Sequence, residues 1–310
     1  MPAQNADPSG RRPRRLLPVG RVGPSGVGEV IRRAVFLDVD GTLVDYSGRI
    51  PASARHAVRA ARANGHLVFL CTGRSRSELW PDVTDIGFDG LVGGAGAYVE
   101  VGGVELLHRR LEAGQVRQVI DFFGRHGLDY FFEGAGGLFG TPGIQARLRG
   151  LLRGAVPDAV ALAQLEGGLF AYLGEIVVTE QPPTVPVSKV VFVYGPGVTF
   201  AQIRDAFAAD FDVIASSVPL SGATIGEIQL AGVHKASGIE QVIEHLGIAR
   251  RDTLAIGDSD NDLEMLRHAG VGIAMGNARQ HVREAADEVT SPPEEGGVHE
   301  AFVRHGLIDA

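Results

Sequence analysis

The stretch Phe36-Leu37-Asp38-Val39-Asp40-Gly41-Thr42-Leu43-Val44 decides the fold of this 310-residue chain. Apolar residues 34–37 predict a short buried strand, and two carboxylates follow it at a spacing of two. Such a strand end delivers the Asp38 carboxylate and the Asp40 carbonyl to one point, with the Asp40 carboxylate above them. This arrangement suits a nucleophilic aspartate, a divalent cation and a proton donor acting on a phosphate. Isolated Asp-x-Asp pairs are common on surfaces, so the interpretation depends on residues further along the chain.

Short apolar strands alternate with amphipathic helices in the first and last parts of the chain. We expect further strands at 67–71, 91–92, 253–256 and 271–274, and helices at 53–64, 239–246, 262–268 and 281–286. The alternation indicates a parallel sheet covered by helices on both faces, an α/β fold. Ligands of such sheets bind beyond the carboxyl ends of the strands. Asp38, Thr72 and Asp258 all fall at those ends, so the sequence predicts that they share one site.

The middle of the chain has a different pattern, because short paired strands lie there between helices. This pattern predicts an α+β unit at residues 113–231, inserted into the parallel domain. The core is then formed by residues 31–112 and 232–310. Residues 1–30 are rich in Pro, Gly and Arg and show no hydrophobic period, so we expect a disordered tail.

The composition, 45% hydrophobic and 21% charged, is that of a protein with a buried core. The formal charge is −8 and basic stripes with interleaved aromatic residues are missing, which argues against nucleic acid as a partner. No apolar run reaches the roughly 18 residues that a membrane helix needs. Cys71 is the only cysteine, which excludes an internal disulfide and suits a reducing compartment. We expect a cytoplasmic protein without a membrane partner, as a monomer or homodimer.

Three elements downstream supply further groups for phosphate chemistry. The Thr72 hydroxyl stands beside Gly73, which exposes backbone N–H groups, so this turn can hold a phosphoryl oxygen. Lys189 and Lys235 are the only lysines in an arginine-rich chain, and a lysine kept near the C-terminal motifs indicates a need for a compact charge. The run 258–262, Asp-Ser-Asp-Asn-Asp, offers a dense set of oxygen ligands suited to Mg²⁺.

Each of these elements also has an ordinary explanation. Thr-Gly turns are mostly structural, lysines at helix N-termini are commonly solvated, and Asp/Asn clusters commonly cap helices. Cys71 is more simply a buried strand residue than a nucleophile, and His234 more simply a surface histidine than a substrate ligand. The ten histidines show no zinc-binding spacing, so a zinc site is not predicted.

Considered together, the motifs resemble those of the haloacid dehalogenase superfamily of aspartate-nucleophile phosphatases, and within it the Cof-type branch with subclass IIB caps. The resemblance covers residues 34–308 and is carried, in order, by DVDGT (38–42), TGR (72–74), Lys235, GDSDND (257–262) and AMGNA (274–278). It implies a Rossmannoid parallel-sheet core with an inserted α+β cap of the C2B type.

The resemblance also implies a role for each motif residue. Asp38 would attack phosphorus and form an aspartyl-phosphate, Asp40 would protonate the leaving alcohol and then activate water, and Lys235 would hold Asp38 and the phosphate. The implied phosphate-binding residues are Asp38, Thr72, Gly73, Lys235 and Asn261. The implied Mg²⁺ ligands are Asp38, Asp40 and Asp258, with Asp262 in the outer sphere.

The implied activity is Mg²⁺-dependent hydrolysis of a small phosphorylated metabolite such as a sugar phosphate. A phosphosugar mutase and a non-catalytic sugar-phosphate-binding protein are the alternatives. The chain departs from the family at Ala95, where asparagine is usual, and at Ala236, where glycine usually follows the lysine. Because of Ala95, the sequence does not predict how the leaving group is recognised. Ala236 is still compatible with the start of a helix after Lys235.

Overall fold

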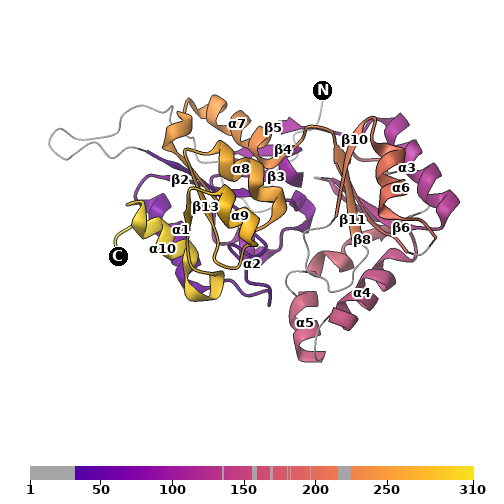
Figure 1. Cartoon of the computed structure of the whole chain (residues 1–310), viewed down its shortest axis with the longest axis horizontal. Coiled ribbons are helices and arrows are strands. Elements are labelled where there is room, and N and C mark those ends of the chain that lie inside the picture. Colours follow the sequence, from indigo (N-terminus) through magenta and orange to yellow (C-terminus); the bar gives the residue numbers. More distant parts are fainter. Residues whose placement is uncertain are drawn as a thin grey trace, which may run out of the picture.

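The computed structural model describes residues 32–134, 136–155, 159–167, 170–179, 181, 183–195, 197–215 and 225–310. The expected disordered tail, residues 1–30, lies outside the described residues. The described chain forms two sheets with their helices, which lie next to each other in Figure 1. None of the described helices is both long and apolar enough to cross a membrane.

The larger sheet has the strand order β14-β13-β12-β1-β2-β3-β4-β5. Neighbouring strands run parallel from β14 to β3, and β4 and β5 extend the sheet antiparallel. Its strands are β1 Ala34–Leu37, β2 Leu67–Cys71, β3 Gly90–Gly93, β4 Tyr98–Val101, β5 Val104–His108, β12 Thr253–Gly257, β13 Val271–Ala274 and β14 Glu288–Val289. Because β1 lies between β12 and β2, residues that follow these three strands come out at the same edge of the sheet.

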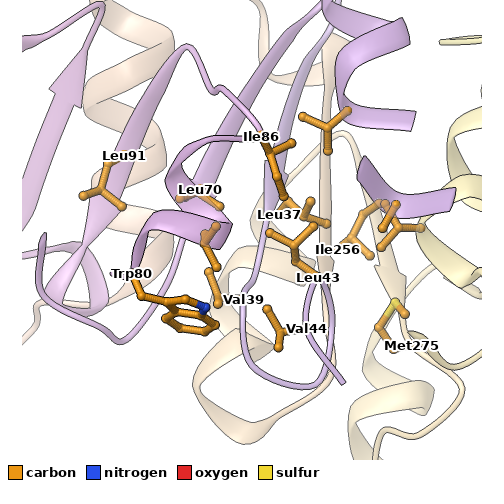
Figure 2. Packing of buried hydrophobic residues seen from close by; sticks show 14 of the residues in the cluster. Leu37, Val39, Leu43, Val44, Leu70, Trp80, Ile86, Leu91, Ile256 and Met275 are labelled. Carbon is orange, nitrogen blue, oxygen red and sulfur yellow. The ribbon is translucent and has the colours of Figure 1, made fainter. Parts of the chain in front are cut away.

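Successive side chains of β1 point into two different hydrophobic cores, as the two-residue period of a strand requires. Val35 and Leu37 belong to the core that includes α1 (Ala52–Ala63) and α10 (Gly297–Arg304). Figure 2 shows part of this core, where Leu37, Leu43 and Ile256 pack together. Ala34 and Phe36 belong to the core on the other face. That face is covered by α7 (Lys235–Leu246), α8 (Leu263–His268) and α9 (Gln280–Ala285).

The second sheet has the order β10-β11-β9-β6-β7-β8 and is antiparallel except for the β7–β8 pair. Its strands are β6 Asp129–Gly134, β7 Gly137–Gly140, β8 Ile176–Val178, β9 Lys189–Val193, β10 Phe211–Ala215 and β11 Ile225–Leu230. One face packs against α3 (Ala113–His126) and α6 (Phe200–Phe207). The other face packs against α4 (Ile144–Ala155) and α5 (Ala159–Gly167).

All strands of this second sheet fall between β5 and α7 of the larger unit, so the smaller α+β unit is an insertion. The predicted fold class, a haloacid dehalogenase-like parallel-sheet core with an inserted α+β cap, is confirmed. The limits 113 and 231 stay a prediction. A short helix, α2 (Pro81–Thr84), and a 3-10 turn, Arg76–Glu78, follow β2 on the side of the insertion, and the turn contacts β6.

Candidate active site

Three neighbouring strands place the central acidic and hydroxyl groups. Asp38 follows β1, Thr72 follows β2 and Asp258 follows β12, and all three side chains are buried. The N-terminus of α7 supplies Lys235 to the same edge. His234 caps that helix by accepting a hydrogen bond from the Ser237 N–H, so helix entry survives although alanine follows the lysine.

Lys235 connects two carboxylates that lie far apart in the sequence. Its Nζ is 2.5 Å from Asp38 Oδ1 and 2.6 Å from Asp262 Oδ1, and its side chain is 0% exposed. Burial alone would lower the pKa of Lys235, but the charges of Asp262 and Asp38 outweigh burial and raise it. The lysine therefore stays cationic at neutral pH and holds the Asp38 carboxylate in a fixed orientation.

Asp262 is fully engaged by the protein. While Oδ1 pairs with Lys235, Oδ2 accepts hydrogen bonds from the backbone N–H groups of Asp258, at 3.0 Å, and Ser259, at 2.9 Å. Asp262 thus fixes the loop that carries Asp258. This arrangement fits a residue outside the ligand sphere of a metal better than a direct ligand.

The donor set suits a divalent cation. Carboxylate oxygens of Asp38, Asp258 and Asp262 lie within 4.8 Å of one another, and Lys235 supplies the positive charge between them. Burial raises the pKa of Asp38 well above its usual value, and burial together with the charge of Asp262 raises the pKa of Asp258 to about 7. A bound cation offsets the electrostatic repulsion between carboxylates that are crowded in this way.

Two more features around Asp258 fit the same ion. The Oδ1 atom of Asn277 is buried and accepts no hydrogen bond from the described residues. Gly41 has φ +82°, and a Cβ added there would lie 2.3 Å from Asp258 Oδ2, so a side chain would displace that carboxylate. The residues present therefore fit Mg²⁺ held by oxygen ligands.

Tyr46 and Asn277 contact Asp258 although the sequence analysis gave neither a role. The Tyr46 hydroxyl donates to Asp258 Oδ2 at 2.5 Å, and Asn277 Nδ2 donates to the same oxygen at 3.1 Å and to Gly41 O at 2.9 Å. Asn277 lies inside the quoted AMGNA stretch, which was the available signal. Tyr46 belongs to no motif, and its contact depends on how the loop after β1 turns.

Asp40 is not part of this acidic group, and an arginine holds its carboxylate. Arg74 Nε is 2.8 Å from Asp40 Oδ2, and Arg74 Nη2 is 3.0 Å from Oδ1. The guanidinium lies over the ring of Trp80, at 5.0 Å, and over that of Tyr172 in the inserted unit, at 5.6 Å. Arg74 was part of the quoted TGR motif but had no assigned role. The Asp40 carbonyl as a metal ligand stays a prediction.

The predicted phosphate-binding turn is ordered by local hydrogen bonds. Thr72 Oγ1 accepts from the Arg74 N–H at 3.1 Å, which leaves the hydroxyl proton to donate elsewhere. A Cβ added to Gly73 would lie 3.2 Å from Asn261 Nδ2, so the Asn261 amide faces this turn. Asp260, between the other acidic residues of its loop, is exposed and pairs with Arg279 and His281 instead.

Ala95 has a left-handed backbone, with φ 54° and ψ 31°, and its N–H donates to Thr72 O at 3.0 Å. This conformation costs a residue with a Cβ about 1–2 kcal/mol, while glycine and asparagine tolerate it. We therefore expect Ala95→Gly to raise the free energy of unfolding by about 1 kcal/mol, measured by urea denaturation. Ala97→Gly is the control, because Ala97 has φ −73° and should lose stability. Equal losses in both variants would contradict the prediction.

Comparison with known proteins places this geometry in a family. The family model described as haloacid dehalogenase-like hydrolase matches residues 35–302. The chain belongs to this family. The predicted resemblance to haloacid dehalogenase superfamily phosphatases of the Cof type, subclass IIB, is confirmed, as is the prediction of an enzyme of the phosphatase class.

Several relatives of this haloacid dehalogenase-like hydrolase align over nearly their whole length. The YkrA protein of Bacillus subtilis is 29% identical over 285 residues, covering 89% of this chain and 98% of the relative. A phosphoglycolate phosphatase of Methanothermobacter thermautotrophicus is 30% identical, covering 88% of this chain and 98% of the relative. The solved structure of the subclass IIB sugar phosphatase BT4131 has a TM-score of 0.69 and 25% identity, covering 89% of this chain and 100% of that one.

Proposed function

We propose that this hydrolase releases phosphate from a small phosphorylated metabolite such as a sugar phosphate, through an aspartyl-phosphate on Asp38 and with Mg²⁺ bound. The observation that carries the proposal is the buried Lys235 ammonium, which lies between the carboxylates of Asp38 and Asp262 beside Asp258. A carboxylate fixed by one cation at a strand edge, with oxygen ligands for a second, is arranged to attack phosphorus.

The proposed reaction has two steps. An oxygen of Asp38 bonds to phosphorus while the bond from phosphorus to the ester oxygen breaks, and Asp40 gives its proton to the leaving oxygen. Water then attacks phosphorus, Asp40 takes the proton of that water, and the bond from phosphorus to Asp38 breaks. Inorganic phosphate leaves and both aspartates return to their starting forms. Thr72, Gly73, Lys235 and Asn261 are the proposed groups that hold the phosphoryl oxygens.

Arg74 holds Asp40 but leaves it able to transfer a proton. Each Asp40 oxygen accepts one hydrogen bond from Arg74 in the structure, so a second lone pair on each oxygen remains for the proton. Because Tyr172 from the inserted unit packs on Arg74, we propose that residues 113–231 act as a cap whose position affects Asp40.

Asp38, the Asp40 carbonyl and Asp258 are the proposed Mg²⁺ ligands, with Asp262 in the outer sphere because Lys235 and the loop N–H groups occupy its oxygens. When bound, Mg²⁺ offsets negative charge on the phosphoryl oxygens. The protein contributes the fixed carboxylates, and Tyr46 and Asn277 orient the one on Asp258.

Metal binding is expected to stabilise the protein in a pH-dependent way. The pKa of Asp258, about 7, is above its ordinary 3.8, so the metal-free folded state retains a proton that the unfolded chain loses. The free energy of unfolding of the metal-free protein therefore falls as pH rises from about 4 to 7. Excess Mg²⁺ should raise the unfolding midpoint by roughly 5 °C near pH 8 and much less near pH 5. Scanning calorimetry with Mg²⁺ or EDTA measures this, and Asp258→Asn should abolish the gain; equal gains at both pH values would contradict it.

The names of relatives support a small phosphorylated substrate. They include phosphoglycolate phosphatases, the subclass IIB sugar phosphatase and the 5-amino-6-(5-phospho-D-ribitylamino)uracil phosphatase YcsE of Bacillus subtilis, 42% identical over 82 residues, or 26% of this chain. The test is phosphate release from a panel of sugar phosphates and other phosphomonoesters, with Mg²⁺ and with EDTA. Release only with the metal supports the proposal, whereas hexose phosphate interconversion without release would replace it with a mutase. The single, buried Cys71 supports a reducing, cytoplasmic location.

A further inference from the structure

Lys189, the second of the two lysines, has no part in the proposed chemistry although it is nearly as buried as Lys235. It begins β9 of the inserted unit and is 4% exposed. Its Nζ donates to Gly73 O at 2.9 Å and to Glu227 Oε2 at 3.2 Å, and it lies 3.1 Å from Glu133 Oε2. The inserted unit thus places an ammonium and two carboxylates against the predicted phosphate-binding turn.

The strand register explains why these three groups meet. Glu133 of β6 lies directly opposite Lys189, and Glu227 of β11 lies two residues from Gln229, which is opposite Lys189 on the other side. All three therefore share one face of the sheet. The intervening residues, among them Phe132 and Val190, belong to the core under α3 and α6 on the opposite face. The charged groups of Lys189, Glu133 and Glu227 therefore lie on the face away from that core. There the Lys189 ammonium contacts Gly73 of the core unit.

Glu133 is an unusual member of this group. It is 1% exposed, and neither of its carboxylate oxygens has a hydrogen-bond donor in satisfactory geometry within the described chain, although the Lys189 ammonium is close. Buried acceptor atoms without a hydrogen-bond donor destabilise a protein and are uncommon. Two buried oxygens with spare acceptor capacity, beside the phosphate turn, can accept hydrogen bonds from hydroxyl groups of a bound molecule.

The charge balance of the group restricts what that molecule can be. Lys189 faces both Glu133 and Glu227, and Glu78 of the adjoining 3-10 turn is buried nearby. Three carboxylates, those of Glu133, Glu227 and Glu78, are thus gathered around the Lys189 ammonium. An additional anion would meet repulsion here, whereas a neutral polyol would find acceptors.

We propose that Lys189, Glu133 and Glu227 form a leaving-group subsite that accepts neutral, hydroxyl-bearing leaving groups and rejects those that carry a second anionic group. This inference rests on the proposed function, because it takes the phosphate to lie at Asp38 and the Thr72–Gly73 turn. It narrows the substrates to monophosphate esters of neutral alcohols, and it assigns that preference to charges contributed by the inserted unit.

A matched pair of small esters tests the subsite with the full chain and Mg²⁺. The pair is 2-hydroxyethyl phosphate, with a neutral leaving group, and 2-phosphoglycolate, which replaces the hydroxymethyl end by a carboxylate. We expect kcat/KM to be at least about tenfold higher for the neutral ester. Glu227→Gln and Glu133→Gln should each reduce this ratio at least about threefold, mainly by lowering the KM for phosphoglycolate. Glu105→Gln, an exposed change on β5, is the control and should leave the ratio unchanged.

The outcomes separate this inference from the proposed function. Failure to hydrolyse any ester, including a generic aryl phosphate, would overturn the proposed function itself. If the enzyme hydrolyses the aryl phosphate but its kcat/KM for phosphoglycolate equals or exceeds that for the neutral ester, only the subsite is overturned. Because the wild-type ratio alone decides this, the test remains valid even where a glutamine variant fails to fold. A ratio unaffected by both glutamine variants would also reject the assignment to these residues.

Discussion

Asp38→Asn is expected to lower kcat/KM for aryl phosphate hydrolysis by at least about 10⁴-fold. The amide cannot form the bond to phosphorus that the proposed aspartyl-phosphate requires. It also removes the charge that pairs with Lys235 at 2.5 Å, so the phosphate would be held with altered geometry. Phosphate release by the purified protein with Mg²⁺, measured at saturating and limiting substrate, gives both kcat and kcat/KM.

Loss of folding would not explain this result. Asparagine keeps the shape of the aspartate side chain, and Lys235 keeps its ion pair with Asp262 at 2.6 Å. We therefore expect Asp38→Asn to remain folded at the assay temperature, which its unfolding midpoint measures. Asp121→Asn, an exposed change on α3, is the matched control and should retain full activity. More than a tenth of wild-type activity in Asp38→Asn would end the proposed covalent mechanism.

Lys235→Met should lower both stability and activity. Methionine approximates the length of the lysine side chain but leaves Asp38 and Asp262 buried and close together without their cation. Removing one partner of a buried ion pair costs about 3–5 kcal/mol. Loss of a charge that offsets the phosphoryl oxygens should lower kcat by about 10³-fold. Urea denaturation and phosphate release measure the two effects separately.

A double variant distinguishes the structural role of Lys235 from its chemical role. In Lys235→Met with Asp262→Asn, one of the two uncompensated carboxylates is gone, so a large part of the lost stability should return. Activity should not return, because the cation beside Asp38 is still missing. A single variant that is as stable as the wild type, or a double variant that regains activity, would show that Lys235 does not have the role proposed here.

The core of the site could be predicted because it depends on strand ends. Asp38, Thr72 and Asp258 each follow an apolar run, and parallel strands bring such residues to one edge whatever the loops do. The order of the motifs also allowed Lys235 to be predicted as a site residue. Its two carboxylate partners are 197 and 27 residues away in the chain. Spacing alone could not have indicated those pairings, and the family resemblance supplied them.

The contacts that sequence reasoning missed depend on side-chain reach and on sheet register. Arg74 stood in a quoted motif, but its bidentate hold on Asp40 follows from the path of the chain after β2. The meeting of Lys189 with Glu133 requires the antiparallel register of β9 and β6, which period-two patterns leave undetermined. The helix expected at 53–64 lies at Ala52–Ala63, after Pro51 and without a side-chain cap.

The position of Arg74 between two aromatic rings has a consequence for the timing of turnover. Trp80 belongs to the core unit and Tyr172 to the inserted unit, and the guanidinium between them grips the proposed acid. A displacement that carries Tyr172 outward removes its ring from Arg74. It thereby weakens the support of the guanidinium that is hydrogen-bonded to Asp40. Release of the dephosphorylated alcohol and a change in the position of the Asp40 carboxyl would then be two results of one movement of the inserted unit.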